Sequence, residues 1–88
     1  MVKTYQVYFS PEAESSLGHL DKQIAQRILD RIKWLSQHVE DIKHKALTGN
    51  LKRTFKFRIG DYRVIYELKY NISVLTILLV GHRSDIYK

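Results

Sequence analysis

Residues 55–67 read FKFRIGDYRVIYE, a pattern typical of two short strands joined by a turn at Gly60-Asp61. In the first strand Phe55, Phe57 and Ile59 alternate with Lys56 and Arg58. Successive residues of a strand face opposite sides of a sheet, so one side packs and the other carries positive charge. The stretch therefore predicts a β-hairpin with a cationic face that suits an anionic ligand.

The neighbouring segments extend this hairpin into a fold. Ser10 and Pro11 are expected to be an N-cap and a first helical residue. Asp21 is a second N-cap candidate, for a longer helix whose apolar residues recur from Ile24 to Val39. Residues 41–51 lose this periodicity and are expected to form a connection. Strands are predicted at residues 3–9, 51–59, 62–68 and 72–80, and GHRSDIYK is left as a tail. The order β-α-α-β-β-β predicts an α+β fold, with a two-helix hairpin packed on one face of a mostly antiparallel β-sheet.

Composition limits the class of protein. A chain of 88 residues is expected to form a single domain, residues 1–88. It has no cysteine, no signal-like N-terminus and no apolar run long enough to span a bilayer, which favours a cytoplasmic protein without a membrane partner. Residues 1–44 are electrically balanced, and residues 45–88 carry the whole net charge of +6. That asymmetry indicates a polyanionic partner, either nucleic acid or an acidic protein.

Several kinds of chemistry lack their sequence signature. The chain contains no phosphate-binding glycine loop, no dinucleotide fingerprint and no HExxH motif. Its histidines, at positions 19, 38, 44 and 82, show no ligand spacing. We therefore expect no metal site and no cofactor.

The remaining candidates are basic and aromatic residues of the second half. In an antiparallel meander the start of the middle strand and the end of the last strand lie near one another, so Arg63 and Arg83 are expected to approach Lys56. Arginines match phosphate oxygens and stay ionised, and a lysine or tyrosine among cations becomes a better acid or base. Such a group has the parts for RNA cleavage without a metal. The full set is Lys52, Arg53, Lys56, Arg58, Arg63, His82, Arg83 and Tyr87.

A structural interpretation of the same residues also stands. Lysine and arginine on a strand commonly keep a sheet edge soluble, and Arg63 could pair with Glu67 or Asp85 at the surface.

The motifs GDYRVIY and GHRSDIY, separated by one hairpin and preceded by two helices, resemble those of the RelE/ParE superfamily of toxins from toxin–antitoxin modules. The likeness in size and element order covers essentially the whole chain. It implies an mRNA interferase, an endoribonuclease that enters the ribosomal A site, cuts the message without a metal and inhibits translation. It also implies a monomeric free toxin, silenced by an acidic, helical RelB-like antitoxin.

The resemblance also implies roles for individual residues. Arg63 and Arg83 match the arginines that hold the scissile phosphate, and Tyr87 matches the C-terminal tyrosine that orients the substrate nucleotide. Lys56 matches one catalytic lysine. The second lysine of that pair falls at Thr54 here, so His82 is a further catalytic candidate, and Lys52, Arg53 and Arg58 are candidates for substrate binding.

Two other functions remain open at this point. The ParE branch of the same superfamily inhibits DNA gyrase and cuts no RNA, although the presence of Arg63, Arg83 and Tyr87 together favours the nuclease. A structural basic protein would instead be harmless when overexpressed.

Overall fold

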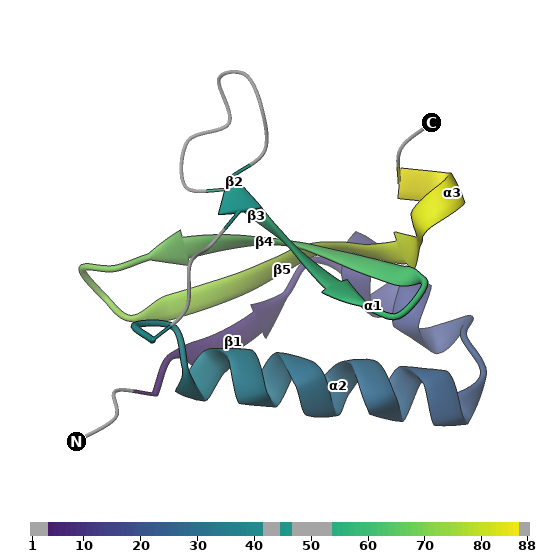
Figure 1. The fold of residues 1–88 in the computed structure, drawn as a ribbon, viewed down its shortest axis with the longest axis horizontal. Helices are drawn as coiled ribbons and strands as arrows, with labels where there is room; N and C mark the ends of the chain where they lie inside the picture. Colours follow the sequence, from purple (N-terminus) through teal and green to yellow (C-terminus); the bar gives the residue numbers. More distant parts are fainter. Residues whose placement is uncertain (1–3, 42–44, 47–53, 87–88) are drawn as a thin grey trace.

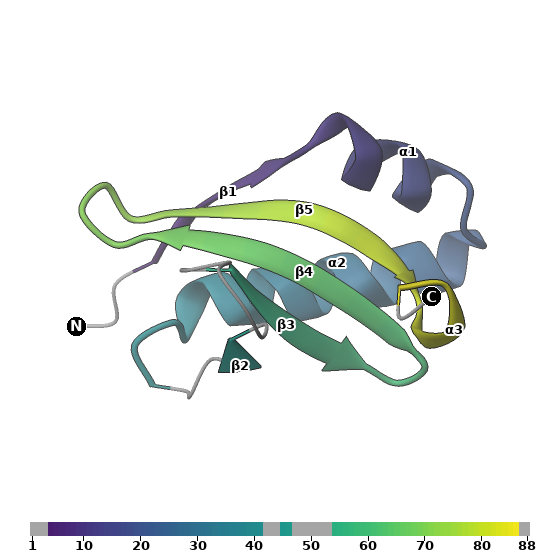
Figure 2. The same cartoon turned by 90° about the horizontal axis from the view of Figure 1, so that it is seen from above.

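The predicted α+β architecture is confirmed in the computed structural model, which describes residues 4–41, 45–46 and 54–86. Five strands form one sheet in the order β1-β5-β4-β3-β2, in which β1 is parallel to β5 and the other neighbours are antiparallel. Figure 2 shows β1 and α1 on one side of β5, and β4 and β3 on the other. The elements are β1 (Gln6–Phe9), α1 (Pro11–Gly18), α2 (Lys22–Gln37), β2 (Lys45–Ala46), β3 (Thr54–Ile59), β4 (Tyr62–Lys69), β5 (Val74–His82) and α3 (Arg83–Ile86).

Both expected N-caps are present. Ser10 Oγ accepts a hydrogen bond from the backbone N–H of Ala13 at 3.1 Å, and Asp21 Oδ1 accepts one from Gln23 N at 2.8 Å. Ser10 Oγ also donates to the carbonyl of Leu78 at 2.7 Å. The first cap therefore ties the start of α1 to β5, in addition to satisfying an otherwise unpaired N–H of the helix.

The core lies between α2 and the sheet. Helix α2 runs along one face of the sheet, and α3 stands on the opposite side (Figure 1). Ile28, Ile32 and Leu35 of α2 are buried in one cluster with residues of β4 and β5. Trp34 stacks on Phe57 with ring centroids 6.4 Å apart, and both partly buried rings pack against this cluster. No helix of the described residues has the length and apolarity needed to cross a membrane.

Two predicted boundaries are wrong. Residues 45–46 were expected in a connection, but they form β2 and pair with Phe55 and Lys56 of β3. Two residues are too few to show the alternation of apolar and polar side chains that marks a strand in a sequence. The pairing of β2 therefore depends on the neighbouring strand β3. Strand β5 begins at Val74, after a turn in which Ser73 has a φ of 55°, and runs on to His82. Gly81 and His82, which were expected in a C-terminal tail, therefore belong to β5. The tail residues Arg83–Ile86 form helix α3.

The hairpin has the two faces that its alternation predicts. Phe55 and Phe57 lie opposite Tyr66 and Val64 and contact the core. The other face, here called the outer face, holds Lys56 opposite Ile65 and Arg58 opposite Arg63.

Candidate functional site

Arg58 and Arg63 form the centre of the cationic surface. They are register partners at the end of the β3–β4 hairpin, so their side chains share the outer face. Like charges directly opposite one another destabilise a sheet pair. Within the described part of the chain neither guanidinium forms an ion pair with a carboxylate, including that of Glu67. The surface ion-pair interpretation of Arg63 therefore finds no support from Glu67.

The turn between the two strands holds both arginines in place. Gly60 has a φ of 59°, a conformation that glycine adopts without the steric cost of a Cβ. Its carbonyl accepts hydrogen bonds from Arg63 Nη1 at 3.0 Å and from Arg58 Nε at 3.4 Å. Arg63 Nη1 also donates to the carbonyl of Tyr62 at 3.0 Å. The remaining guanidinium donors of Arg58 and Arg63 have no hydrogen-bond partner within the part of the chain that the structure describes.

Lys56 lies on the same face of β3, two residues before Arg58. It is half-buried, and Thr54, two residues before it, is buried. Because Lys56 faces Ile65, it is diagonal to Arg63 across the ladder. The structure thus brings Lys56, Arg58 and Arg63 onto one surface.

The start of α3 joins this surface through the backbone. The N–H of Arg83 donates to the carbonyl of Asp61 at 2.8 Å, so α3 is attached to the same hairpin turn. Arg83 itself is exposed, and it forms no ion pair with a carboxylate among the residues whose side chains are described. The turn therefore gathers three of the predicted arginines, at positions 58, 63 and 83.

His82 has a defined hydrogen-bonding role. The backbone N–H of Ser84 donates to His82 Nδ1 at 3.2 Å, and Ser84 Oγ lies 2.9 Å from the same atom. A backbone N–H can only donate, so Nδ1 is an acceptor and the proton of the neutral ring is on Nε2. The ring also meets Tyr62 edge-on, with centroids 5.6 Å apart. His82 in this state offers a donor, whereas its basic nitrogen is occupied at the start of α3.

A fourth arginine reaches the same turn from helix α2. A Cβ added to Gly60 would lie 3.5 Å from Arg27 Nη2, so this guanidinium lies against the turn. It also lines a small recess of about 160 Å³ with Asp61 and Tyr62. No signal in the sequence marks Arg27, because the residue lies in the electrically balanced half and in no motif. Only the packing of α2 beneath the hairpin reveals it.

Other predicted residues cannot be placed. Lys52, Arg53 and Tyr87 lie outside the described residues. The described residues contain no group of three or more histidines, cysteines or acidic residues gathered as metal ligands.

A family model described as "ParE toxin of type II toxin-antitoxin system, parDE" matches residues 7–87. The chain belongs to this family of toxins. The sequence resemblance to the RelE/ParE superfamily is thereby confirmed.

Solved structures extend the likeness of this toxin to RelE proteins. A chain of the RelBE2 toxin–antitoxin complex from Mycobacterium tuberculosis is 31% identical, with a TM-score of 0.82 and 97% of each chain covered. A chain of the RelE–RelB complex from Pyrococcus horikoshii is 28% identical, with a TM-score of 0.74, over 91% of this chain and 96% of that one. The isolated E. coli RelE toxin, at 20% identity and a TM-score of 0.74, shares the fold over 94% of this chain and 90% of its own.

A curated relative gives a shorter match. Toxin RelG of Mycobacterium tuberculosis is 41% identical over 44 residues, which are 50% of this chain and 51% of that protein. The match thus spans about half the length of the curated relative.

Proposed function

We propose that this toxin is an endoribonuclease that cleaves mRNA in the ribosomal A site without a metal ion and so inhibits translation in the cytoplasm. The observation that carries the proposal is that Arg58 and Arg63 share the outer face at the hairpin turn, to which the backbone of Arg83 is bonded. None of the three forms an ion pair with a carboxylate among the residues whose side chains the structure describes. Uncompensated cations on one surface attract the phosphates of a nucleic acid.

Each step of RNA cleavage needs a group that this surface supplies. As a 2′-hydroxyl attacks the adjacent phosphorus, it gives its proton to a base, the O2′–P bond forms and negative charge builds on the phosphate oxygens. The P–O5′ bond then breaks, and an acid delivers a proton to the leaving 5′-oxygen. Arg63 and Arg83 stabilise that charge through their fixed donors. Lys56, on the same face as Arg63, is the candidate for moving protons, whereas His82 is the register partner of Tyr62 and so faces the helix side of the sheet. Tyr87 orients the substrate nucleotide, and Lys52, Arg53 and Arg58 bind neighbouring phosphates.

The same cations suit a protein inhibitor. We propose that the free toxin is a monomer and that its cognate antitoxin is a RelB-like, acidic and helical chain. The similar structures include toxin–antitoxin complexes from M. tuberculosis and P. horikoshii. An acidic chain over the outer face would neutralise the charges that we assign to RNA, which accounts for inhibition by simple occlusion.

The first experiment is to map mRNA 5′ ends within minutes of inducing the toxin in growing cells. We expect new ends inside translated codons with the wild type, and a loss of about 100-fold or more with Arg63→Ala or Arg83→Ala. Lys69→Ala is the matched control, because Lys69 is an exposed cation at the far end of β4. Thermal melting of each variant separates loss of chemistry from loss of fold.

Growth arrest with intact messages would refute the ribonuclease. Accompanying damage to DNA would favour inhibition of gyrase, the alternative that the ParE description of the matching family keeps in view. The arginines would then form a protein-binding surface.

A further inference from the structure

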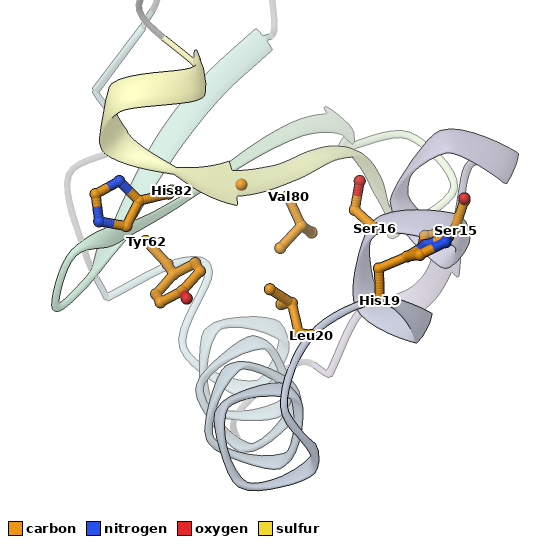
Figure 3. Close-up of a pocket in the computed structure, with 8 residues that line it drawn as sticks. Ser15, Ser16, His19, Leu20, Tyr62, Val80 and His82 are labelled. Atoms are coloured by element: carbon orange, nitrogen blue, oxygen red, sulfur yellow. The ribbon is translucent and has the colours of Figure 1, made fainter.

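A larger recess lies on the helix side of the sheet, beside the cationic turn. Its volume is about 450 Å³, within the range of roughly 300–1,000 Å³ usual for small-molecule sites. Figure 3 shows Tyr62 and His82 on one side and Ser16 and His19 on the other, with Leu20 and Val80 between them. We call this recess the α1–β5 groove.

The groove offers hydrogen-bonding groups of both kinds and no fixed charge. The side chains on its α1 side include Ser15, Ser16 and His19. His19 Nδ1 lies 2.7 Å from the carbonyl of Ser15, which can only accept, so Nδ1 donates and Nε2 of the neutral ring is an acceptor. His82 has the opposite tautomer, with its donor on Nε2. Among the residues that the structure describes, no carboxylate, lysine or arginine lines the groove.

These properties favour a neutral heteroaromatic ring as the occupant. Val80 and Leu20 provide apolar surface against which a ring can pack, and Tyr62 and His82 provide aromatic contact. Donors and acceptors around an apolar floor match the edges of a nucleobase. A phosphate would lack a cation here, and an acidic peptide would lose the hydration of its carboxylates without an ion pair.

The position of the groove links it to the arginines. Gly81 lines the groove and is the register partner of Arg63, while His82 directly precedes Arg83. A nucleotide with its phosphate at the hairpin end of the sheet would therefore have this groove beside it, around the end of β5.

We propose that the α1–β5 groove binds a nucleobase of the RNA substrate next to the scissile phosphate and thereby contributes to sequence preference. The inference rests on the proposed ribonuclease function. The nucleotide that fits best is the one whose edge complements the acceptor of His19 and the donor of His82.

Binding can be tested apart from cleavage by NMR titration of the full chain with AMP, GMP, CMP and UMP. Ribose 5-phosphate is the matched probe without a base. We expect all five compounds to shift the amides of Arg58 and Arg63, and only the nucleotides to shift those of Ser16, His19 and Gly81. Identical shift maps for the nucleotides and ribose 5-phosphate would overturn the groove assignment.

Selectivity is tested by filling the groove. Ser16→Tyr places a ring in it, and Glu14→Tyr adds the same side chain at an exposed position of α1 outside the groove lining. We expect Ser16→Tyr to change the relative use of cleavage sites by about tenfold, with Glu14→Tyr leaving it unchanged. His19→Ala is the second variant should Ser16→Tyr fail to fold, and the same redistribution is expected of it.

The two proposals fail in different ways. Cleavage by a folded groove variant with an unchanged distribution of sites would refute the groove and leave the ribonuclease intact. A wild-type chain that cuts no message refutes the ribonuclease, and with it the role of the groove in selecting cleavage sites.

Discussion

Arg58 lies directly opposite Arg63 across the β3–β4 hairpin, and both side chains donate to the same carbonyl, that of Gly60. The pairing brings two like charges together and so opposes the stability of the hairpin. A sheet selected for stability alone would place an acid at one of the two positions. The arrangement is instead suited to a ligand that supplies the missing negative charge.

Arg58→Glu tests this conflict between stability and function. The new cross-strand pair should raise the free energy of unfolding by a few tenths of a kcal/mol, because both side chains are solvated. RNA cleavage should fall, since a carboxylate then repels the phosphate. Chemical denaturation and the 5′-end assay measure the two effects on one protein.

The control for this change is Lys69→Glu, which alters the net charge equally at the far end of the exposed hairpin surface. It should leave cleavage close to wild type. A loss of cleavage as large as that of Arg58→Glu would mean that net charge matters and the position of Arg58 does not.

Ser10 is expected to contribute to stability through two bonds. Its hydroxyl caps α1 at Ala13 N and donates to the carbonyl of Leu78. Ser10→Ala removes both interactions and should lower the free energy of unfolding by about 1–2 kcal/mol. Ser10→Thr retains a hydroxyl and should recover most of that loss in urea denaturation. Equal stability of the alanine and threonine variants would contradict the dual role.

Gly60 is required by the conformation of the turn. Alanine at a φ of 59° carries a steric cost of about 1–2 kcal/mol, and its Cβ would meet Arg27 Nη2 at an ordinary contact distance of 3.5 Å. Gly60→Ala should therefore lower the melting temperature through backbone strain. In a Gly60→Ala, Arg27→Ala double variant the loss should persist; full recovery would instead assign the cost to the contact with Arg27.

The buried phenol of Tyr66 is expected to make the free energy of unfolding depend on pH in the alkaline range. Burial, with a smaller contribution from Tyr70, raises the pKa of the Tyr66 phenol far above its ordinary value of 10.0. Below about pH 10 the phenol is protonated in both states, so the full stability is present. Above it the unfolded chain ionises first, and the free energy of unfolding falls by up to about 1.4 kcal/mol per pH unit.

Tyr66→Phe should therefore show a shallower loss of stability above pH 10 than the wild type. Denaturant melts between pH 9 and about pH 11 measure the two slopes. Tyr8→Phe, at an exposed position, is the control and should follow the wild-type profile. Parallel profiles for Tyr66→Phe and the wild type would show that another group governs alkaline unfolding.

Much of the fold was readable because local signals and packing agree. The alternation in residues 55–59, the caps at Ser10 and Asp21 and the apolar stripe of α2 each specify one local structure, and the tertiary fold uses all of them. Strand β2 and the helical part of the supposed tail were missed because their structures depend on neighbours. Lys45 pairs with Lys56, and the N–H of Arg83 meets Asp61 across the turn.

The site was only partly readable for a related reason. Alternation and the hairpin placed Lys56, Arg58 and Arg63 on one face, as expected. The tautomer of His82 depends on Ser84 N, and the proximity of Arg27 depends on how α2 crosses beneath Gly60. Neither relation leaves a periodic signal, because each joins residues through geometry that forms only on folding.

Salt dependence provides a direct count of the cations that contact RNA. A single strand that contacts Lys56, Arg58, Arg63 and Arg83 through four phosphates should give a slope of about −3 in a plot of log K against log salt concentration. A 2′-O-methylated RNA is the appropriate probe, because its blocked hydroxyl prevents cleavage during titration.

Arg58→Ala should weaken binding and reduce the slope by about 0.7, since one fewer counterion is released. Lys69→Ala should leave the slope unchanged. A wild-type slope near zero would mean that the uncompensated arginines of the hairpin make no phosphate contacts, and the outer face would then have to be assigned to a protein partner.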